Sequence, residues 1–281
     1  MTGTSSHVEL PRSVRLALWL AHASRRTALA PEDEPDHTAR VVAAVRGDDE
    51  PHALHDPEAS EPVSGPAMFL PEDGAAFTRA VSGWLRGGCT AVSLLPVPGD
   101  VSGLPALVSE RAVEAGECVL LTSGGRHVVA VPEVVTFGSA WEQGHTVTWH
   151  VSETGPWEHR FFAAVGTLAE AEREMRYALI QATEALMDLD VARWREDAAH
   201  EIEHLRSGLL PPWDLPDALP RRQVQVLATA ARLRAIVALA QDDDGAATSL
   251  WQVDQRSTAL REVERSARRA MAAATCTPLV D

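Results

Sequence analysis

The sequence predicts an α+β protein: a mixed β-sheet with a β-α-β unit in the N-terminal part, followed by a C-terminal all-α antiparallel helical bundle. Strand-like and helix-like segments alternate up to residue 165, and glycine-containing turns join several of the strands. From residue 166 onward, the spacing of apolar residues changes from a period near 2 to one near 3.5, which is typical of packed helices. We therefore predict two domains, 1–165 and 166–281.

The first hundred residues contain a predicted helix, a strand and an acidic loop. A helix with a broad apolar face is predicted to start near Ser13, after Pro11. Its segment Leu16–Ala23 (LALWLAHA) fits a short signal-peptide core equally well, and we favour the helix. Ala39–Val45 (ARVVAAV) is rich in β-branched residues and predicts a strand. Residues 47–66 are rich in Asp, Glu and Pro, which predicts a surface loop.

The β-α-β unit is predicted in the segment that follows. A helix over Pro71–Gly88 ends at two glycines, and a strand over Cys89–Leu95 comes directly after it. A second helix over Pro105–Ala115 and a strand over Glu117–Thr122 complete the unit. A length of about thirty residues suits a crossover connection, so we expect the two strands to be parallel neighbours with a right-handed connection.

Later strands are expected to pair in the antiparallel direction. Ser123–Arg126 (SGGR) is a tight-turn sequence that leads into an apolar run beginning at His127. Gly144–Val151 (GHTVTWHV) alternates between apolar and polar residues, which indicates a strand with one buried face. His145 and His150 then lie on opposite faces of that strand. We expect a mixed sheet of about five or six strands.

The C-terminal helices are predicted from caps and apolar spacing. Thr167 and Glu170 have the spacing of a capping box, so a helix should begin there. Two further helices are expected near 221–241 and 246–274, joined by short connections that favour antiparallel packing. We expect the core of the bundle to include Leu179, Leu186, Ile202, Leu233, Leu260 and Val263.

Composition excludes several classes of function. The net charge is −15, which disfavours binding to nucleic acid and to anionic membranes. The chain has no lysine and no asparagine, which excludes a Walker phosphate loop, Schiff-base catalysis and a papain-like triad. No apolar run approaches the roughly 20 residues of a membrane span. The three cysteines are widely spaced and odd in number, which fits a reducing compartment and a cytoplasmic protein.

One motif corresponds to a known mechanism. His200–His204 reads HEIEH, which resembles the H-E-x-x-H motif of zincin metalloproteases. The resemblance implies a zinc ion bound by His200 and His204, with Glu201 as the catalytic general base. At 100° per residue, however, both histidines point away from the apolar stripe that contains Ile202. We therefore favour a polar helix face over a metal centre.

Two loops offer weaker candidate sites. The acidic loop contains three potential metal ligands, His52, His55 and Asp56, for which a solvated loop is the favoured interpretation. The loop Pro96–Gly103 follows the first strand of the β-α-β unit, and ligands favour the C-terminal ends of such strands. Asp100 and Ser102 are its polar groups, and a plain connector is the favoured interpretation.

The sequence therefore favours a cytoplasmic, non-catalytic interaction or regulatory protein without a cofactor. Its expected partner is another protein or a second copy of the chain, and neither nucleic acid nor a membrane. One alternative is a zinc-dependent hydrolase that uses His200, Glu201 and His204. The other alternative is a small-ligand binder at the 96–103 loop.

Overall fold

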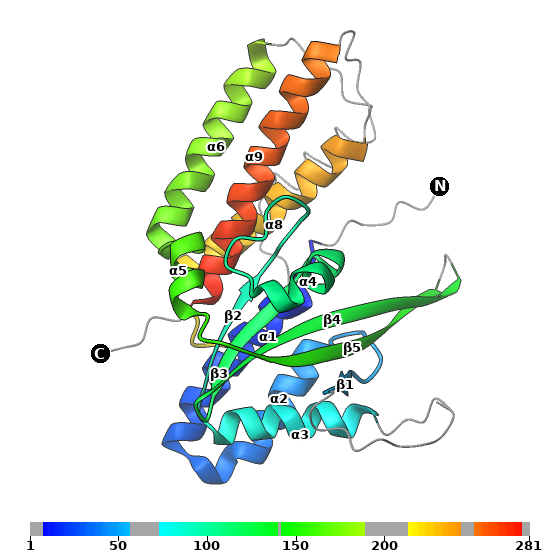
Figure 1. Ribbon diagram of the computed structural model, residues 1–281, viewed down its shortest axis with the longest axis vertical. Helices are drawn as coiled ribbons and strands as arrows, with labels where there is room; N and C mark the ends of the chain where they lie inside the picture. The colour runs from blue at the N-terminus through cyan, green and yellow to red at the C-terminus, as the bar shows by residue number, and fades with distance from the viewer. Residues whose placement is uncertain (1–7, 57–72, 140–141, 189–212, 243–249, 277–281) are drawn as a thin grey trace. The chain divides into compact units, whose positions relative to one another are not determined.

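The computed structural model describes residues 8–56, 73–139, 142–188, 213–242 and 250–276 (Figure 1). Contacts divide the chain into two compact units. One unit consists mainly of residues 11–164 and contains the β-sheet; the other consists mainly of residues 165–213 and 219–274 and contains helices that pack together. The predicted α+β class is confirmed.

The β-sheet has five strands in the order β1-β5-β4-β3-β2. The strands are β1 (Ala53–His55), β2 (Cys89–Leu94), β3 (Cys118–Ser123), β4 (Arg126–Ser139) and β5 (Glu142–Thr154). The short β1 runs parallel to β5, and the other three neighbouring pairs are antiparallel. The sheet is therefore mixed, as predicted.

The connection between β2 and β3 differs from the prediction. These strands are antiparallel neighbours, so the predicted parallel crossover is wrong. Leu94 at the end of β2 lies opposite Cys118 at the start of β3, so β3 begins at the same end of the sheet at which β2 ends. The connection contains the 3-10 helix η2 (Ala106–Val108) and α4 (Ser109–Ala115). Helix α4 is only about 10 Å long, whereas β2 spans roughly 20 Å, so α4 cannot return the chain along the strand.

The β3–β4 turn is the tight turn that its sequence predicts. Gly124 and Gly125 have φ angles of 56° and 79°, in the left-handed region that glycine adopts without strain. The turn sets the register in which Ser123 lies opposite Arg126. It thereby places Thr122 of β3 opposite His127 of β4.

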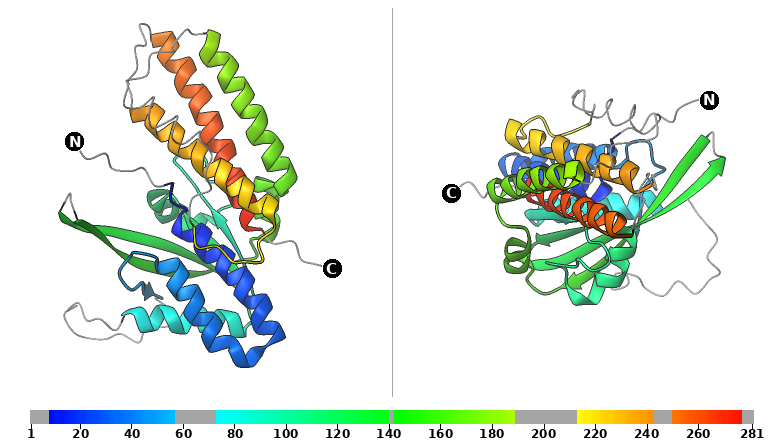
Figure 2. Two further views of the ribbon diagram at one scale, coloured as in Figure 1. Left: turned by 180° about the vertical axis from the view of Figure 1, so that it is seen from behind. Right: turned by 90° about the horizontal axis from the view of Figure 1, so that it is seen from above.

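Helices α1 (Arg12–Leu29), α2 (Glu34–Arg46) and α3 (Asp73–Arg86) lie on one side of the sheet (Figures 1 and 2). The 3-10 helix η1 (Pro31–Asp33) joins α1 to α2. Alternate residues of each strand point toward these helices, because side chains alternate between the two faces of a sheet. The shared core includes Leu16, Leu20, Val41, Phe77, Val81, Val119, Leu121, Ala130 and Trp149. The first helix and the helix before β2 are therefore confirmed.

The predicted strand at Ala39–Val45 is wrong, because this segment forms the last two turns of α2. Val41 and Val45 are four residues apart, so they share one helix face, and both are fully buried. Burial of that face outweighs the modest preference of β-branched residues for strands. Pro35 lies in the first turn of α2, where a missing N–H breaks no helical hydrogen bond.

In the helical unit, the structure describes α6 (Leu168–Asp188), α8 (Arg221–Asp242) and α9 (Leu250–Thr275). The short helix α5 (Glu158–Val165) precedes them in the chain. The predicted capping box is present at the start of α6. The Glu170 N–H donates to Thr167 Oγ1 at 3.3 Å, and the Thr167 N–H donates to Glu170 Oε2 at 2.9 Å.

The core of this unit agrees with the prediction in α8 and α9 and differs in α6. Leu233, Leu260 and Val263 are buried, as predicted. Leu179 is 41% exposed, so its predicted place in the core is wrong. Helix α6 instead buries Ala171, Met175, Ala178 and Ala182, a stripe of three alanines and one methionine that leaves Leu179 on its exposed side. The side chains of Leu186 and Ile202 lie outside the described residues.

Helix α8 contains a segment, Arg221–Gln241, that is long and apolar enough to cross a membrane. Half of its most apolar window is buried inside the structure, and the core helix of a bundle meets the same test. Arg234 lies mid-helix, with its Nε 3.5 Å from Glu264 Oε1 of α9. A charged side chain at the middle of a membrane span is costly, so these features favour a bundle helix.

Candidate functional site

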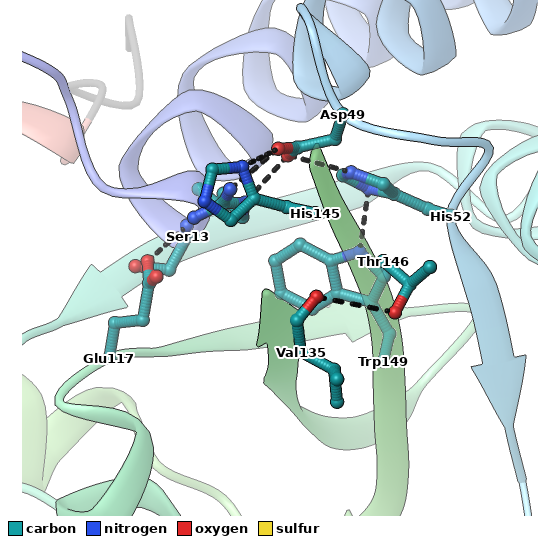
Figure 3. A network of polar contacts seen from close by, with 9 residues as sticks. Ser13, Asp49, His52, Glu117, Val135, His145, Thr146 and Trp149 are labelled. Carbon is teal, nitrogen blue, oxygen red and sulfur yellow. Dashed lines mark hydrogen bonds and ion pairs between the residues drawn. The ribbon is translucent and has the colours of Figure 1, made fainter. Parts of the chain in front are cut away.

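A network of polar side chains lies between the start of α1 and β5, with Asp49 at its centre (Figure 3). Arg12 donates two hydrogen bonds to Asp49, from Nε to Oδ2 and from Nη2 to Oδ1, each at 2.6 Å. His52 Nε2 lies 3.2 Å from Oδ2, and His145 Nδ1 lies 3.6 Å from Oδ1. Because the Asp49 side chain is only 6% exposed, protein groups surround the carboxylate.

The Asp49 carboxylate is stabilised in its charged form. Burial raises the pKa of Asp49, but the hydrogen bonds and charge of Arg12 and the hydrogen bond with His52 outweigh it and hold the pKa below its usual range. Two parallel hydrogen bonds from an arginine guanidinium to a carboxylate are stronger than hydrogen bonds between neutral groups. With both oxygens already bonded, Asp49 is arranged to hold protein segments together rather than to receive a substrate.

His52 is held in a single tautomer. The Trp149 indole N–H, which can only donate, donates to His52 Nδ1 at 3.1 Å, so Nδ1 is unprotonated (Figure 3). Burial and, to a smaller extent, the charges of Arg12 and Arg15 outweigh the opposing effect of Asp49 and lower the pKa of His52 to about 4. At neutral pH the ring is therefore neutral and carries its proton on Nε2, facing Asp49.

This geometry argues against base catalysis by His52. A general base needs a free nitrogen lone pair within reach of the substrate. The Nδ1 lone pair of His52 already accepts the indole proton, and the ring is buried. The network instead joins α1, the segment after α2 and β5. We therefore interpret it as structural.

Residues 47–56, the described part of the predicted acidic loop, contain more regular structure than their composition predicts. His52 is buried, and Ala53–His55 form strand β1 beside β5. Among the residues that the structure describes, no group of three or more His, Cys, Asp and Glu side chains could hold a metal ion. Sequence reasoning missed the role of His52, because its partner Trp149 is 97 residues away.

Glu117 forms a second buried polar contact, at the start of α1 (Figure 3). Pro11 precedes α1 and provides no side-chain cap. The Ser13 N–H donates to Glu117 Oε2 at 2.7 Å instead, and the Ser13 and Ser93 hydroxyls lie 2.8 Å apart. A carboxyl group supplied from β3's N-terminal end thus satisfies a free N–H of the first helical turn. Burial raises the pKa of Glu117 despite these hydrogen bonds and the nearby charges of Arg12 and Arg15.

Glu117→Gln should shift the slope of stability against pH in the positive direction, because it removes one contribution that falls as the pH rises. Because the pKa of Glu117 is raised in the folded protein, the folded state binds more protons than the unfolded chain. The contribution of Glu117 to wild-type stability should therefore fall as the pH rises from the unfolded value of about 4.3 through the folded pKa. Glutamine keeps the shape and does not titrate, so this contribution disappears. Urea unfolding between about pH 4 and pH 7 measures the two slopes.

The same substitution at the exposed Glu114 is the matched control, since it also removes one negative charge. Its slope should follow that of the wild type. If the slopes of the Glu117 and Glu114 variants are equal, the buried carboxyl is not the source of the pH dependence.

Thr122, His127 and Glu158 form a third cluster, on β3, β4 and α5. The Thr122 hydroxyl donates to Glu158 Oε1 at 2.7 Å and lies 3.0 Å from His127 Nδ1. Burial raises the pKa of Glu158, but the Thr122 hydrogen bond, backbone N–H groups and His127 outweigh it and lower the pKa. In nucleophilic catalysis the hydroxyl gives its proton to the histidine. Here the proton points to the carboxylate, so the cluster is not arranged for that chemistry.

A depression of about 470 Å³ lies over α1 and α2. It is lined by Arg26, Asp33, Asp36, His37, Ala39 and Arg40. His37 is buried, with Nδ1 3.0 Å from the Thr27 hydroxyl. Small-molecule sites are usually lined by apolar residues with a few polar groups. This lining is dominated by exposed charges of both signs, so it does not resemble such a site.

The most exposed apolar surface of the sheet is a two-stranded arm, formed by residues 133–139 of β4 and 142–148 of β5. The arm extends beyond the other strands (Figure 1). Val134, Val135 and Phe137 are 38%, 54% and 46% exposed. Strands usually have five or six residues, so an arm of this kind is an unusual extension, and the described residues of its own unit leave it uncovered.

The arm has a defined conformation at Phe137. This residue lies opposite Gly144 in the β4–β5 pair, and its ring covers the glycine. A Cβ atom at Gly144 would lie 2.5 Å from Phe137 Cζ, so a larger residue would displace the ring. The Thr146 hydroxyl donates a long hydrogen bond, 3.5 Å, to the Val135 carbonyl oxygen (Figure 3). The exposed apolar side chains thus sit on an ordered ribbon.

The sequence also singled out two other groups of residues. His200, Glu201 and His204 are outside the described residues, so the zinc-site hypothesis stays a prediction. Asp100 and Ser102 lie in the loop after β2, whose backbone turns back through hydrogen bonds between Val97 and Asp100. The ligand-site hypothesis for this loop depends on a parallel crossover between β2 and β3. Since β2 and β3 are antiparallel, that condition is not met.

Comparisons with known proteins matched two family models. The N-terminal domain of Rv1486c-like protein matches residues 13–161, which is more than half of the chain, and its C-terminal domain matches residues 169–272. No curated protein and no solved structure matches the chain. The sequence thus carries both domains of one family in their named order, and the chain belongs to the Rv1486c-like protein family.

Proposed function

We propose that this is a non-catalytic, cytoplasmic interaction protein that binds another protein chain through the β4–β5 arm. The observation that carries the proposal is the exposure of Val135 and Phe137 on one face of an ordered ribbon, with Val134 exposed on its other face. Grouped apolar side chains on a soluble protein's surface commonly mark a protein interface. A strand edge also offers backbone groups that can pair with another strand.

Two further features support the proposal. In the Asp49 network the His52 Nδ1 lone pair accepts the Trp149 indole N–H, and in the Thr122 cluster the hydroxyl donates to Glu158 rather than to a histidine. The described cysteines are free, and burial raises the pKa values of Cys89 and Cys118 to about 12. Such thiols are unreactive, and unpaired cysteines are common in the reducing cytoplasm.

Charging the arm should abolish binding. In vivo cross-linking of the tagged full chain, with adducts identified by mass spectrometry, should give one defined adduct, with this chain or another protein. The double variant Val135→Glu/Phe137→Glu should lose that adduct, because burying two carboxylates in an apolar contact is unfavourable. Circular dichroism should show a wild-type fold, since both side chains are exposed.

Tyr177→Glu is the matched control, because Tyr177 is an exposed aromatic residue of α6, 65% exposed and distant in sequence from the arm. It should keep the adduct. Equal cross-linking by all three proteins would overturn the proposal. About one equivalent of zinc in untagged protein, lost in His204→Ala, would favour the zinc-dependent hydrolase instead.

A further inference from the structure

We infer that the partner of the arm is a second copy of this chain, paired edge to edge through β4 in a two-fold symmetric, antiparallel dimer. The inference rests on the proposed function and adds the identity of the partner. Three properties of the arm support it: the β4 edge is open, its sequence from 134 to 139 has no charge or proline, and two copies of the edge are complementary in an antiparallel pair.

The open edge belongs to β4. Strand β3 pairs with β4 from Arg126 to Ala130, and no described strand continues along that side beyond it. Each residue from 133 to 139 is exposed. The opposite edge, on β5, is partly covered, because the Glu50 N–H donates to the His145 carbonyl at 2.9 Å and β1 pairs with residues 148–150. An incoming strand would therefore find free backbone groups on β4.

Within the part of the chain that the structure describes, this edge lacks the features that prevent strand pairing. Natural edge strands are protected by charges, prolines, bulges or a covering element. Pro132 lies at the base of the arm, but Val134–Ser139 (VVTFGS) contains neither a charge nor a proline. Its β-branched and aromatic residues favour a strand. The segment therefore favours pairing with another uncharged strand.

The edge is complementary to itself. A two-fold axis through Thr136 places Val135 opposite Phe137 of the partner subunit, on the same face of the joined sheet. Aromatic and β-branched residues form favourable cross-strand pairs. Glu133 then faces Ser139 of the partner subunit and lies about 20 Å from its own copy. That separation exceeds the Debye length of about 8 Å, so two chains of net charge −15 can meet here without close repulsion.

Sedimentation velocity of the full chain over a range of concentrations tests the dimer. The wild type should change from monomer to dimer as the concentration rises, because an interface made by two arms is small. Val135→Glu/Phe137→Glu should stay monomeric at all concentrations, because the register puts glutamate opposite glutamate. Val135→Lys/Phe137→Glu should dimerise again, because each new lysine then faces a new glutamate. Tyr177→Glu should behave as the wild type.

Several results would overturn the inference. These are a wild type that remains monomeric, a dimer that persists in the double-glutamate variant, and a folded charge-pair variant that does not dimerise. Its failure is distinguishable from failure of the proposed function. If the wild type is monomeric but still cross-links through the arm to a different protein, the dimer inference is wrong and the proposed interaction role stands. If the wild type is monomeric and also gives no arm-dependent adduct, both the dimer and the proposed interaction role are wrong.

Discussion

Replacing Trp149 with alanine should lower the free energy of unfolding by about 3–5 kcal/mol. The side chain is fully buried in the core between the sheet and its helices. Its ring stacks against Phe77, with 6.0 Å between centroids and 10° between planes. Alanine would leave a large cavity and remove the indole N–H from His52. Chemical denaturation at neutral pH measures the loss.

The companion variant Trp149→Phe separates packing from hydrogen bonding. Phenylalanine retains much of the buried ring but cannot donate to His52 Nδ1, so a smaller cost of about 1–3 kcal/mol is expected. The pKa of His52 should rise from about 4, because Nδ1 becomes free to take a proton while Asp49 still favours the charged ring. NMR titration of the histidines reports this change. Equal costs for both variants would show that ring packing is not the main source of stability here.

Leu233→Ala should lower the free energy of unfolding of the helical unit by about 2–5 kcal/mol. Leu233 is buried in α8, and a Leu-to-Ala change in a packed core leaves a cavity in addition to the lost burial. Arg265→Ala is the matched control on α9. Arg265 is largely exposed, and its 3.9 Å ion pair with Glu262 is solvated, so the change should stay within about 0.5 kcal/mol.

Denaturant midpoints of the two variants decide whether the assigned core is correct. A large shift for Leu233→Ala with almost none for Arg265→Ala supports the bundle core described above. Equal shifts, or a shift only for Arg265→Ala, would show that the buried face of α8 or α9 is assigned wrongly.

Features that depend on neighbouring residues could be read from the sequence. The capping box of Thr167 and Glu170 closes within one helical turn, and the Gly124–Gly125 turn needs only glycine's access to positive φ. The buried residues of α8 and α9 follow from apolar spacing along one segment. These elements were predicted because the interactions that specify them span only a few residues.

The polar clusters depend on hydrogen bonds between residues about a hundred positions apart, which a single sequence does not reveal. His52 lies in a stretch rich in acids and prolines, and only Trp149, 97 residues later, accounts for its burial. Glu117 caps a helix whose first turn is 104 residues earlier. The arm could have been suspected from the many β-branched residues after His127, but its exposure depends on where β3 stops.

By itself the sequence determined the α+β class, the order of most elements, and their caps and turns, because local hydrogen bonds and apolar periodicity encode them. Tertiary structure decided that β2 and β3 are antiparallel, that Ala39–Val45 is helical and that Leu179 is exposed. Each of these depends on which distant surface is available for burial. Long-range packing outweighs local propensities of a few tenths of a kcal/mol per residue, so only the folded chain shows the outcome.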